Sequence, residues 1–592
     1  MSEGQRTSVS GKAFDLKLFG RVLAYTQPYR GRFILSIVQT FALSLFSIVR
    51  PFIIMYAIND CIRTKDLNML LIYTLIMIAS LFIESFLQYR NAYLTGWLGQ
   101  TIIKDLRVQL YRHIVSLRAK YFDNTPIGQL VTRTISDIEA ISDIFSQGFI
   151  IIMGDILTLI VFVVAMFAVN WKLALAVMAV VPLLLLSTYI FKNAVKASFQ
   201  DVRTQVARLN TFVQEHITGM KIVQIFNRED AEYERFRRIN AAHRDANIRS
   251  VFSYSVFFPV VEILLSAAIG LVIRVAGREL YNLEVQAGEV TFFLLLSNMF
   301  FRPIRMLADR INVLQMGMVA SERVFRVLDT REQIEDKGTV AGNMEGNVLF
   351  SKVWFAYNDE NYVLRDISFR VNKNETIALV GSTGSGKTSV INLLNRFYEY
   401  NKGEISIDGI NIRDYRIDWL RRHIAVVLQD VFLFSDTIAN NVSLCNPDIT
   451  REQIIAASKA VGAHDFIMNL PGNYDYNVME RGAMLSVGQR QLIAFIRAYV
   501  YNPRILVLDE ATSSIDTEAE LLIQEATRKL TENRTSIVIA HRLATVQRAD
   551  RIIVMDHGRI VEQGSHQELL KLNGQYRKLF ELQFKGERTD AL

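Results

Sequence analysis

A glycine-rich loop, GSTGSGKT at residues 381–388, has the residue types needed to hold phosphate groups. It follows the apolar segment TIALV, which predicts a strand, and precedes SVINLLNRF, whose pattern predicts a helix. The glycines allow backbone N–H groups to approach phosphate oxygens. Lys387 is expected to reach the β- and γ-phosphates and Thr388 to offer its hydroxyl to Mg²⁺. We therefore predict a phosphate-binding loop made of Gly381, Ser382, Thr383, Gly384, Ser385, Gly386, Lys387 and Thr388.

Two acidic residues and a histidine follow further predicted strands. The segment ILVLDE ends in Asp509 and Glu510, and TSIVIAH ends at His541. Asp509 is placed to hold the Mg²⁺ shell through water, and Glu510 to polarise an attacking water as a general base. A histidine in that position can contact the γ-phosphate and the water, although a lone histidine is more often structural. The pattern predicts phosphate transfer to water, with Glu510, His541 and Lys387 as catalytic residues.

A second segment also suits an anion. MLSVGQRQL, residues 484–492, is typical of a helix start, where exposed N–H groups favour a phosphate. A phosphate cradle already lies about a hundred residues earlier, so the residues alone leave open whose phosphate this segment holds.

These residues must be positioned by more than one domain, because 592 residues are too many for a single core. Hydrophobic residues make up 51% of the chain, and the long apolar runs all lie before about residue 310. An apolar run of about 20 residues can cross a bilayer as a helix. Six runs qualify: 33–57, 68–89, 148–169, 172–192, 251–273 and 288–309.

Stretches of about sixty residues separate the second from the third run and the fourth from the fifth. They are charged but helical in pattern, which predicts that the membrane helices continue far into the cytoplasm. Their basic residues place that side inside the cell. Six crossings then put both termini in the cytoplasm and the turns near 62, 170 and 282 outside.

Five charged residues interrupt or border the apolar runs: Arg50, Glu84, Asp155, Glu262 and Arg302. Charges in membrane spans usually face a cavity or a partner, so a polar substrate pathway is one interpretation, with Asp155 and Glu262 as the better candidates. The alternative is that long side chains such as Arg50 and Arg302 reach the interface. Pro51, Pro182, Pro259 and Pro303 are expected to bend their helices.

The net charge of +7 is explained by the basic flanks of the apolar runs, so we expect no nucleic-acid partner. Two distant cysteines, Cys61 and Cys445, offer no disulfide framework and no zinc spacing. The first thirty residues lack the apolar core of a cleavable signal peptide. Residues 14–25 mix apolar and basic positions at helical spacing, which suits either a helix lying on the membrane surface or an ordinary packing helix.

The phosphate loop, LSVGQ, VLDE and a strand ending in histidine, in this order, resemble the ATP-binding domain of ABC transporters over about 348–582. The resemblance implies that Tyr357 stacks on adenine and that Gln429 meets Mg²⁺ and senses the membrane domain. It also implies that Ser514 and Asp516 lie in a loop crossing the dimer interface, and that VMERG before the signature is the family's cross-linking loop.

The membrane half is similar to the exporter branch of that family. YFDNTPIGQLVTRTISDIEAI resembles its first intracellular loop, with a short coupling helix near 133–143, and ITGMKIVQIFNRE, 217–229, resembles the second. The short N-terminal segment leaves no room for the peptidase domain of some peptide exporters. The expected fold class is a six-helix membrane domain with long cytoplasmic extensions, followed by an α/β P-loop ATPase domain. The expected boundaries are an N-terminal segment at 1–30, the membrane domain at 31–325, a linker at 326–345, the ATPase at 346–582 and a tail at 583–592.

The resemblance answers the question raised by the signature, because each nucleotide in such dimers lies between the phosphate loop of one chain and the signature of the other. Ser486, Val487, Gly488 and Gln489 would then hold the partner's ATP. The usual signature has glycine where this chain has Val487. A homodimer with two altered sites is one interpretation. The favoured one is a heterodimer with a second half-transporter, in which this chain keeps the catalytic residues and carries the altered signature.

The implied mechanism is alternating access. ATP closes the ATPase domains, the coupling helices transmit that closure, and hydrolysis resets the cycle. We expect export of a hydrophobic or amphipathic drug, lipid or peptide by a multi-pass protein of the bacterial inner membrane, with ATP and Mg²⁺ as cofactors and membrane lipids as neighbours. The alternatives are an ATP-gated channel or regulator on the same scaffold and, against the six runs, a soluble ABC ATPase.

Overall fold

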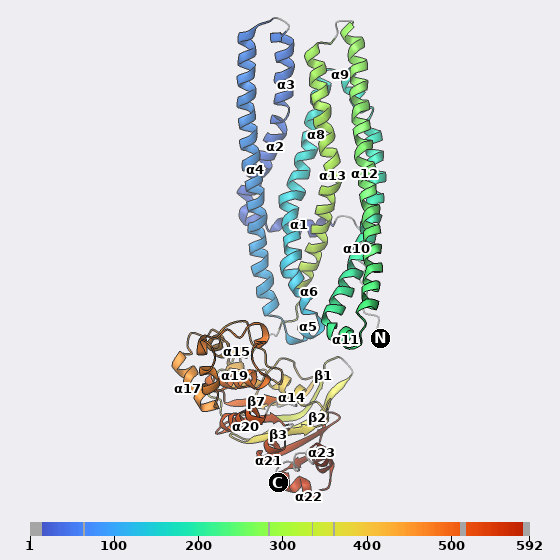
Figure 1. The fold of residues 1–592 in the computed structure, drawn as a ribbon. Coiled ribbons are helices and arrows are strands. Elements are labelled where there is room, and N and C mark those ends of the chain that lie inside the picture. Colours follow the sequence, from blue (N-terminus) through green and yellow to red (C-terminus); the bar gives the residue numbers. More distant parts are fainter. Residues whose placement is uncertain are drawn as a thin grey trace. The chain divides into compact units, whose positions relative to one another are not determined.

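The computed structural model describes residues 15–62, 65–281, 285–333, 336–358, 361–509, 517–540 and 542–583. Its internal contacts divide the chain into two units. The helical unit comprises Met1–Val115 and Pro126–Arg331, and the α/β unit comprises Ser116–Thr125 and Glu332–Leu592. Figure 1 shows long helices in the first unit, from blue to green, and sheets with short helices in the second.

The helical unit is formed by long helices joined by short turns. Its helices are α1 (Leu16–Ala24), α2 (Arg30–Phe46), α3 (Val49–Tyr56), α4 (Leu67–Val115), α6 (Ile127–Thr132), α7 (Ile138–Asp143), α8 (Phe149–Val169), α9 (Trp171–Met178), α10 (Val181–Thr218), α11 (Met220–Ile225), α12 (Glu229–Tyr281) and α13 (Ala287–Leu328). Within the described part of the chain, six helical segments are long and apolar enough to cross a membrane. The six predicted spans are therefore confirmed.

The helices extend well beyond a bilayer. The 49 residues of α4 correspond to about 74 Å at the helical rise, more than twice the roughly 30 Å of a hydrocarbon core. The 53 residues of α12 are longer still. Few glycines or prolines interrupt these stretches, which is why the apolar spans continue directly into charged helices, as predicted.

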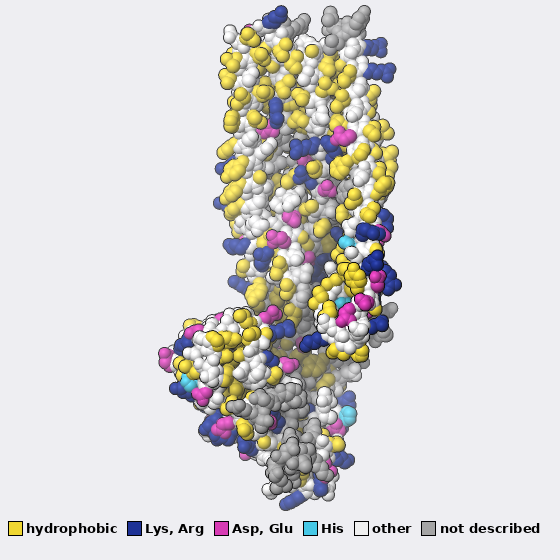
Figure 2. Space-filling model, in the orientation of Figure 1, with side chains coloured by type: hydrophobic (Ala, Val, Ile, Leu, Met, Phe, Trp, Pro, Cys, Tyr) yellow, Lys and Arg dark blue, Asp and Glu magenta, His cyan; other side chains and the backbone are white. Residues whose placement is uncertain are grey.

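Large apolar side chains cover the outside of the helical unit. On α4, Leu71, Leu75 and Phe82 are each more than half exposed. Figure 2 shows hydrophobic side chains over much of the length of this unit, while charged side chains gather near α11. A surface of this kind is costly in water and matches a lipid environment.

Charged residues within the apolar helices form ion pairs that join neighbouring helices. The pairs and their N···O distances are Arg50–Glu84 at 2.8 Å, Asp155–Arg310 at 2.9 Å and Glu262–Arg305 at 2.7 Å. Asp155 and Glu262, the predicted pathway candidates, thus each have a basic partner on α13. Arg302, also on α13, is exposed and has no ion-pair partner among the described residues. A buried or lipid-facing charge is less costly when it is paired.

The predicted N-terminal amphipathic helix is present as α1. Phe19 and Val22 are buried, and the Phe19 ring lies 5.1 Å from that of Phe149 at the start of α8. Arg21 donates two hydrogen bonds, of 2.7 and 2.6 Å, to the carboxylate of Asp329 just beyond α13. The apolar face of α1 therefore packs on the unit itself, in agreement with the packing-helix interpretation.

The α/β unit contains two sheets. Its strands are β1 (Val348–Ala356), β2 (Tyr362–Val371), β3 (Thr376–Gly381), β4 (Lys402–Ile407), β5 (Ile410–Asn411), β6 (Ile424–Val427), β7 (Ile505–Asp509), β8 (Thr535–Ile539), β9 (Arg551–Asp556) and β10 (Arg559–Gly564). An antiparallel sheet has the order β2-β1-β4-β5. The other has the order β10-β9-β3-β8-β7-β6 and is parallel except for β10.

Helices cover the parallel sheet. They are α14 (Lys387–Leu394), α15 (Ile417–His423), α16 (Ile438–Ser443), α17 (Arg451–Val461), α18 (His464–Met468), α19 (Val487–Val500), α20 (Thr517–Thr531), α21 (Leu543–Arg548), α22 (His566–Lys571) and α23 (Gln575–Gln583). The central strand β3 is buried on both faces, because Ile377 and Leu379 belong to one core and Ala378 and Val380 to the other. Such strands are continuous apolar runs, like TIALV.

A short helix from the region between α4 and α6 belongs to the α/β unit. This is α5 (Ala119–Asn124). Arg118, which precedes it, donates its N–H to the carbonyl of Glu332 (2.9 Å) and its Nε to that of Gln333 (2.8 Å). The coupling helix predicted near 133–143 is thus wrong in position. That segment belongs to the helical unit, where Ile138 and Ile141 are fully buried.

Candidate active site

The phosphate loop joins β3 to α14 as predicted, and its glycines are required by close packing. A Cβ on Gly381 would lie 2.2 Å from the carbonyl oxygen of Met555. Gly386 has φ +103°, and a Cβ there would lie 2.6 Å from Leu364 Cδ2. A side chain at either position would shift the loop. These glycines keep backbone N–H groups at the surface of the loop.

Lys387 lies at the start of α14 and is 7% exposed. Its Nζ donates to the carbonyls of Gly381 (2.8 Å) and Ser382 (3.0 Å). Burial lowers the pKa of Lys387, and nearby Asp509 opposes this shift. Burial likewise raises the pKa of Asp509, opposed by Lys387 and reinforced by Asp430. The structure therefore brings the loop lysine and the carboxylate at the end of β7 close enough to stabilise each other's charge.

The donor set around the loop fits a chain of phosphates. Ser385 is 2% exposed, and its hydroxyl oxygen has no hydrogen-bond partner among the described residues. A buried hydroxyl without a partner is costly, and a phosphate oxygen would satisfy it. Ser382, Thr383 and Thr388 are exposed on the same loop. This arrangement can bind a triphosphate, with Lys387 as the counter-charge.

Tyr357 follows β1 and is tied to the phosphate-loop helix. Its hydroxyl lies 3.0 Å from Ser389 Oγ and accepts a 3.1 Å hydrogen bond from Asn392 Nδ2. Ser389 and Asn392 are three residues apart, so they lie on one face of α14. Gln429 is exposed just beyond β6, the strand that pairs with β7. The structure thus places Tyr357 beside the phosphate loop, and Gln429 next to the strand that ends in Asp509.

The segment that was predicted to suit a second anion is the start of α19, so the predicted helix start is present. Ser486 is its N-cap and forms a capping box with Gln489, each side chain accepting from the other's backbone N–H. Val487 is the first helical residue, 47% exposed, and its φ is not positive. The first N–H groups of a helix have no intrahelical acceptor, so those of Val487 and Gly488 stay free for an anion. Valine is accommodated here without backbone strain.

Two family models match the chain. Residues 33–304 match the ABC transporter transmembrane region, and residues 364–513 match the ABC transporter model. An uncharacterized ABC transporter ATP-binding protein of Bacillus subtilis, YknV, is 35% identical over 580 residues, covering 97% of this chain and 96% of the relative. The chain belongs to the ABC transporter family.

Further relatives of this ABC transporter are similar over nearly their whole length. The ATP-dependent lipid A-core flippase of Syntrophus aciditrophicus is 35% identical over 576 residues, or 97% of this chain and 96% of the relative. That of Desulfotalea psychrophila is 36% identical over 561 residues, or 94% and 97%. The helical unit is thus the transmembrane domain and the α/β unit the ATPase domain of a multi-pass membrane protein. It is an exporter that couples ATP hydrolysis to transport, and a soluble ABC ATPase is excluded.

Four residues of the predicted ATP site of this ABC transporter lie outside the described residues. They are Glu510, Ser514, Asp516 and His541. Their roles therefore remain predictions from the sequence, anchored by Asp509 at the end of β7 and by β8, which ends at Ile539.

Sequence reasoning missed several residues around this site. Asn392 and Ser389 could have been found from the sequence, because they are three residues apart on the predicted helix that starts at the phosphate loop. Asp430 and Tyr398 carried none, because only the folded domain brings Asp430 near Asp509 and the Tyr398 ring to 4.9 Å from that of Tyr357.

Proposed function

We propose that this ABC transporter exports an amphipathic molecule, such as a drug, a lipid or a short peptide. The observation that carries the proposal is a small number of charges, mostly paired, within an otherwise apolar helix bundle. Arg302 offers an exposed cation on α13 for a polar group. An apolar cavity of about 310 Å³ between α2 and α8, lined by Ile37, Phe41 and Leu157 among others, offers space for an apolar part. Relatives named as lipid A-core flippases lend support.

A cargo panel tests the proposal. The assembly is reconstituted in vesicles, and ATPase stimulation is measured with cationic dyes, lysophospholipids, short apolar peptides and an uncharged alkane. We expect the amphipaths, but not the alkane, to stimulate the ATPase. Because Arg302 is a cation, replacing it by Gln should weaken the stimulation by compounds that carry an anionic group. Stimulation by none of these amphipaths would contradict the substrate class, and ATP-dependent ion flux in a planar bilayer would indicate the channel instead.

The roles of the ATP-site residues complete the proposal. Tyr357 stacks on adenine, and Lys387 with the loop N–H groups binds the phosphates. Thr388, Gln429 and Asp509, the last through water, are the residues that would hold Mg²⁺, which neutralises charge on the β- and γ-phosphates. Glu510 takes a proton from the attacking water, and His541 orients that water beside the γ-phosphate. Asp516 crosses the dimer interface.

Half-transporters of this family dimerise, and we favour a heterodimer for this chain. Ser486, Val487, Gly488 and Gln489 would contact ATP bound by the partner, whereas Glu510 would act at a site completed by the partner's signature. The helical conformation of Val487 supports a signature that still binds ATP. Its β-branched side chain beside the γ-phosphate supports slower hydrolysis at that site, because close backbone approach is reduced.

Expression of the chain alone and together with a neighbouring half-transporter tests the partner. For a heterodimer we expect obligate co-purification, because a chain with an altered signature cannot complete an efficient site by itself. The measurement is the oligomeric state and the ATPase rate of each preparation. A chain that purifies alone as a dimer with full cargo-stimulated ATPase activity would rule out the heterodimer.

The proposed topology places both termini and the ATPase domain in the cytoplasm of a bacterium. We expect a cysteine at Ile225 of α11 to be protected from a membrane-impermeant maleimide, and one at Trp171, exposed at the start of α9, to be labelled from outside intact cells. Both positions are more than half exposed, so accessibility of the side chain is matched. Labelling at position 225 in intact cells would overturn the topology.

A further inference from the structure

Tyr398 connects two parts of the ATPase domain that are far apart in sequence. Its ring packs edge-on against Tyr357, with centroids 4.9 Å apart and planes at 86°. Its hydroxyl donates a hydrogen bond to the carboxylate of Asp123 in α5. Phe355 completes the cluster, 5.7 Å from the Tyr398 ring and 4.7 Å from that of Tyr357. Contacts therefore run without a gap from the nucleotide site to α5.

The nucleotide end of this connection is held firmly. Two hydrogen bonds, one with the Ser389 hydroxyl and one donated by Asn392, fix the Tyr357 hydroxyl to α14, the helix that begins with Lys387. A change in the position of the Tyr357 ring is thus resisted at its hydroxyl end. Displacement of the ring is instead passed to the two aromatic rings packed on it, since closely packed groups have little free volume to absorb it.

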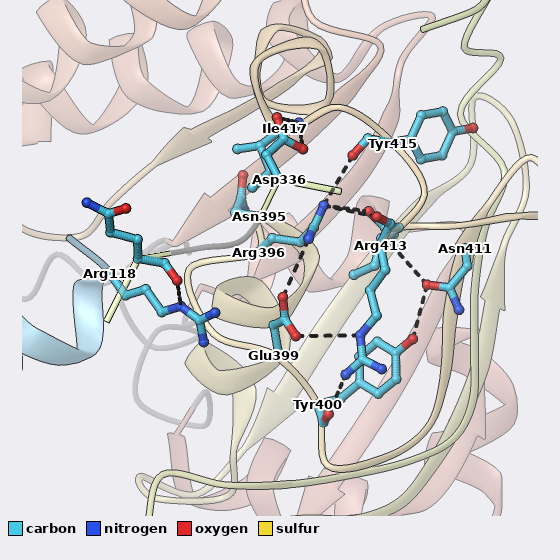
Figure 3. Close-up of polar contacts among 12 residues, drawn as sticks. Arg118, Asp336, Asn395, Arg396, Glu399, Tyr400, Asn411, Arg413, Tyr415 and Ile417 are labelled. Carbon is cyan, nitrogen blue, oxygen red and sulfur yellow. Dashed lines mark hydrogen bonds and ion pairs between the residues drawn. The ribbon is translucent and has the colours of Figure 1, made fainter. Parts of the chain in front are cut away.

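The turn that carries Tyr398 is held by polar contacts of Arg396 and Glu399, which Figure 3 draws. Arg396 is 2% exposed, donates to the carbonyl of Tyr415 (3.1 Å) and pairs with Glu399 (3.4 Å). Glu399 in turn lies 3.7 Å from Arg413. These contacts hold the residues on both sides of Tyr398 to the loop after β5. Tyr398 is therefore presented to α5 by a fixed turn.

The same turn carries a second tyrosine that does not face α5. The Tyr400 ring is stacked by the Arg413 guanidinium at 3.9 Å, and its hydroxyl donates to Asn411 Oδ1 (3.1 Å), within the network of Figure 3. Tyr400 thus matches Tyr398 in side-chain type and location. It lacks a hydrogen bond to Asp123, which makes it a control for loss of a phenol from this turn.

The α5 segment is anchored at one end and contacts Tyr398 further along. Arg118 is bonded to Glu332 and Gln333 within the predicted linker, and Asp123 lies five residues later. With the Arg118 end fixed, movement of the Tyr398 side chain on its fixed turn tilts α5 without releasing it. The hydrogen bond from a phenol to a carboxylate is charge-assisted, so it is strong enough to transmit such a movement.

We propose that Tyr398 is a positioning residue through which the base bound at Tyr357 sets the position of α5, so that the exporter responds to the base of ATP as well as to its phosphates. The proposal rests on the adenine-binding role of Tyr357. The coupling is reciprocal: α5 held in place by Tyr398 favours a bound base by the same factor as the base favours that position.

The test compares AMP-PNP with inorganic tripolyphosphate, which has the phosphates but no base. The full-length assembly carries spin labels at Asn68→Cys and Trp171→Cys, with Cys61→Ala and Cys445→Ser, in phosphatidylethanolamine/phosphatidylglycerol vesicles. The label distance is measured with saturating Mg²⁺ and either ligand. In the assembly with unaltered Tyr398 and Asp123, AMP-PNP should change the label distance much more than tripolyphosphate does. AMP-PNP should change the ratio of the populations with different label distances. Tyr398→Phe should lower that ratio about fivefold or more, to the value seen with tripolyphosphate.

Matched variants distinguish loss of the Tyr398–Asp123 contact from general damage to the folded protein. Asp123→Ala should behave as Tyr398→Phe, whereas Asp123→Asn keeps an oxygen that accepts from the phenol but loses the charge, so it should restore the response only in part. Tyr400→Phe should respond normally. The proposal would be overturned if Tyr398→Phe kept the full change in label distance with AMP-PNP, or if Tyr400→Phe lost as much of it as Tyr398→Phe. It would also be overturned if the assembly with unaltered Tyr398 and Asp123 responded equally to AMP-PNP and tripolyphosphate. AMP-PNP affinity unchanged in Tyr357→Ala would instead refute the adenine role of Tyr357.

Discussion

Replacement of Glu510 by Gln is expected to leave ATP binding intact and to lower turnover on the order of 10³-fold. Gln keeps the size of the side chain but cannot take a proton from the attacking water. Glu510 directly follows Asp509, the last residue of β7. The measurements are equilibrium binding of a fluorescent ATP analogue and the steady-state ATPase rate of the purified assembly. In the heterodimer, this one change should silence nearly all turnover of the pair.

Glu525→Gln provides the control for the Glu510 variant. Glu525 lies on α20, the next described element, and is paired with Arg528 at the surface, away from the predicted site. Its replacement should leave turnover unchanged. A Glu510→Gln protein that keeps more than about a tenth of the normal rate would remove Glu510 from the role of general base.

Replacement of Lys387 by Met is expected to abolish ATP hydrolysis and the stabilisation of the protein by ATP. Met fills a similar volume, but no cation then faces the β- and γ-phosphates, and the carbonyls of Gly381 and Ser382 lose their shared donor. A ligand that binds only the folded state raises the melting temperature, so loss of binding removes that rise. The measurements are the melting temperature with and without Mg·ATP and the ATPase rate.

Lys373→Met is the matched change for Lys387→Met. Lys373 is exposed just before β3 and lies 3.8 Å from Glu345. Its replacement should change neither the rise in melting temperature with Mg·ATP nor the ATPase rate. A Lys387→Met protein that is still stabilised by Mg·ATP to the normal extent would show that phosphate binding does not depend on this lysine.

The elements around the phosphates were predictable because their local signals are strong. The apolar run TIALV becomes the buried strand β3, the glycines lie where a Cβ would collide, and the Ser486–Gln489 capping box begins α19 within the segment where a helix start was predicted. The six membrane spans follow from composition and length alone. In each case a few neighbouring residues decide the structure.

Other features depend on contacts that no local pattern contains. The first predicted span, 33–57, is divided between α2 and α3 at Ser47 and Ile48, and Pro182 begins α10 where a bend was expected. The region 133–143 resembled a coupling helix, yet Ile138 and Ile141 are buried in the helical unit. The role of α5 was not readable, because a six-residue helix is defined mainly by what it contacts.

The assignment of Ser116–Thr125 to the ATPase domain has a consequence for biosynthesis. About 200 residues separate this segment from Glu332, so at ribosomal rates of about 5–20 residues per second it emerges roughly 10–40 seconds before Glu332 and Gln333, and longer before Tyr398, which lies 275 residues after Asp123. During that interval Arg118 and Asp123 have nothing to bind in the unfinished chain. The last docking step of folding therefore joins an early segment to a late domain, and errors in assembly will be exposed at this junction first.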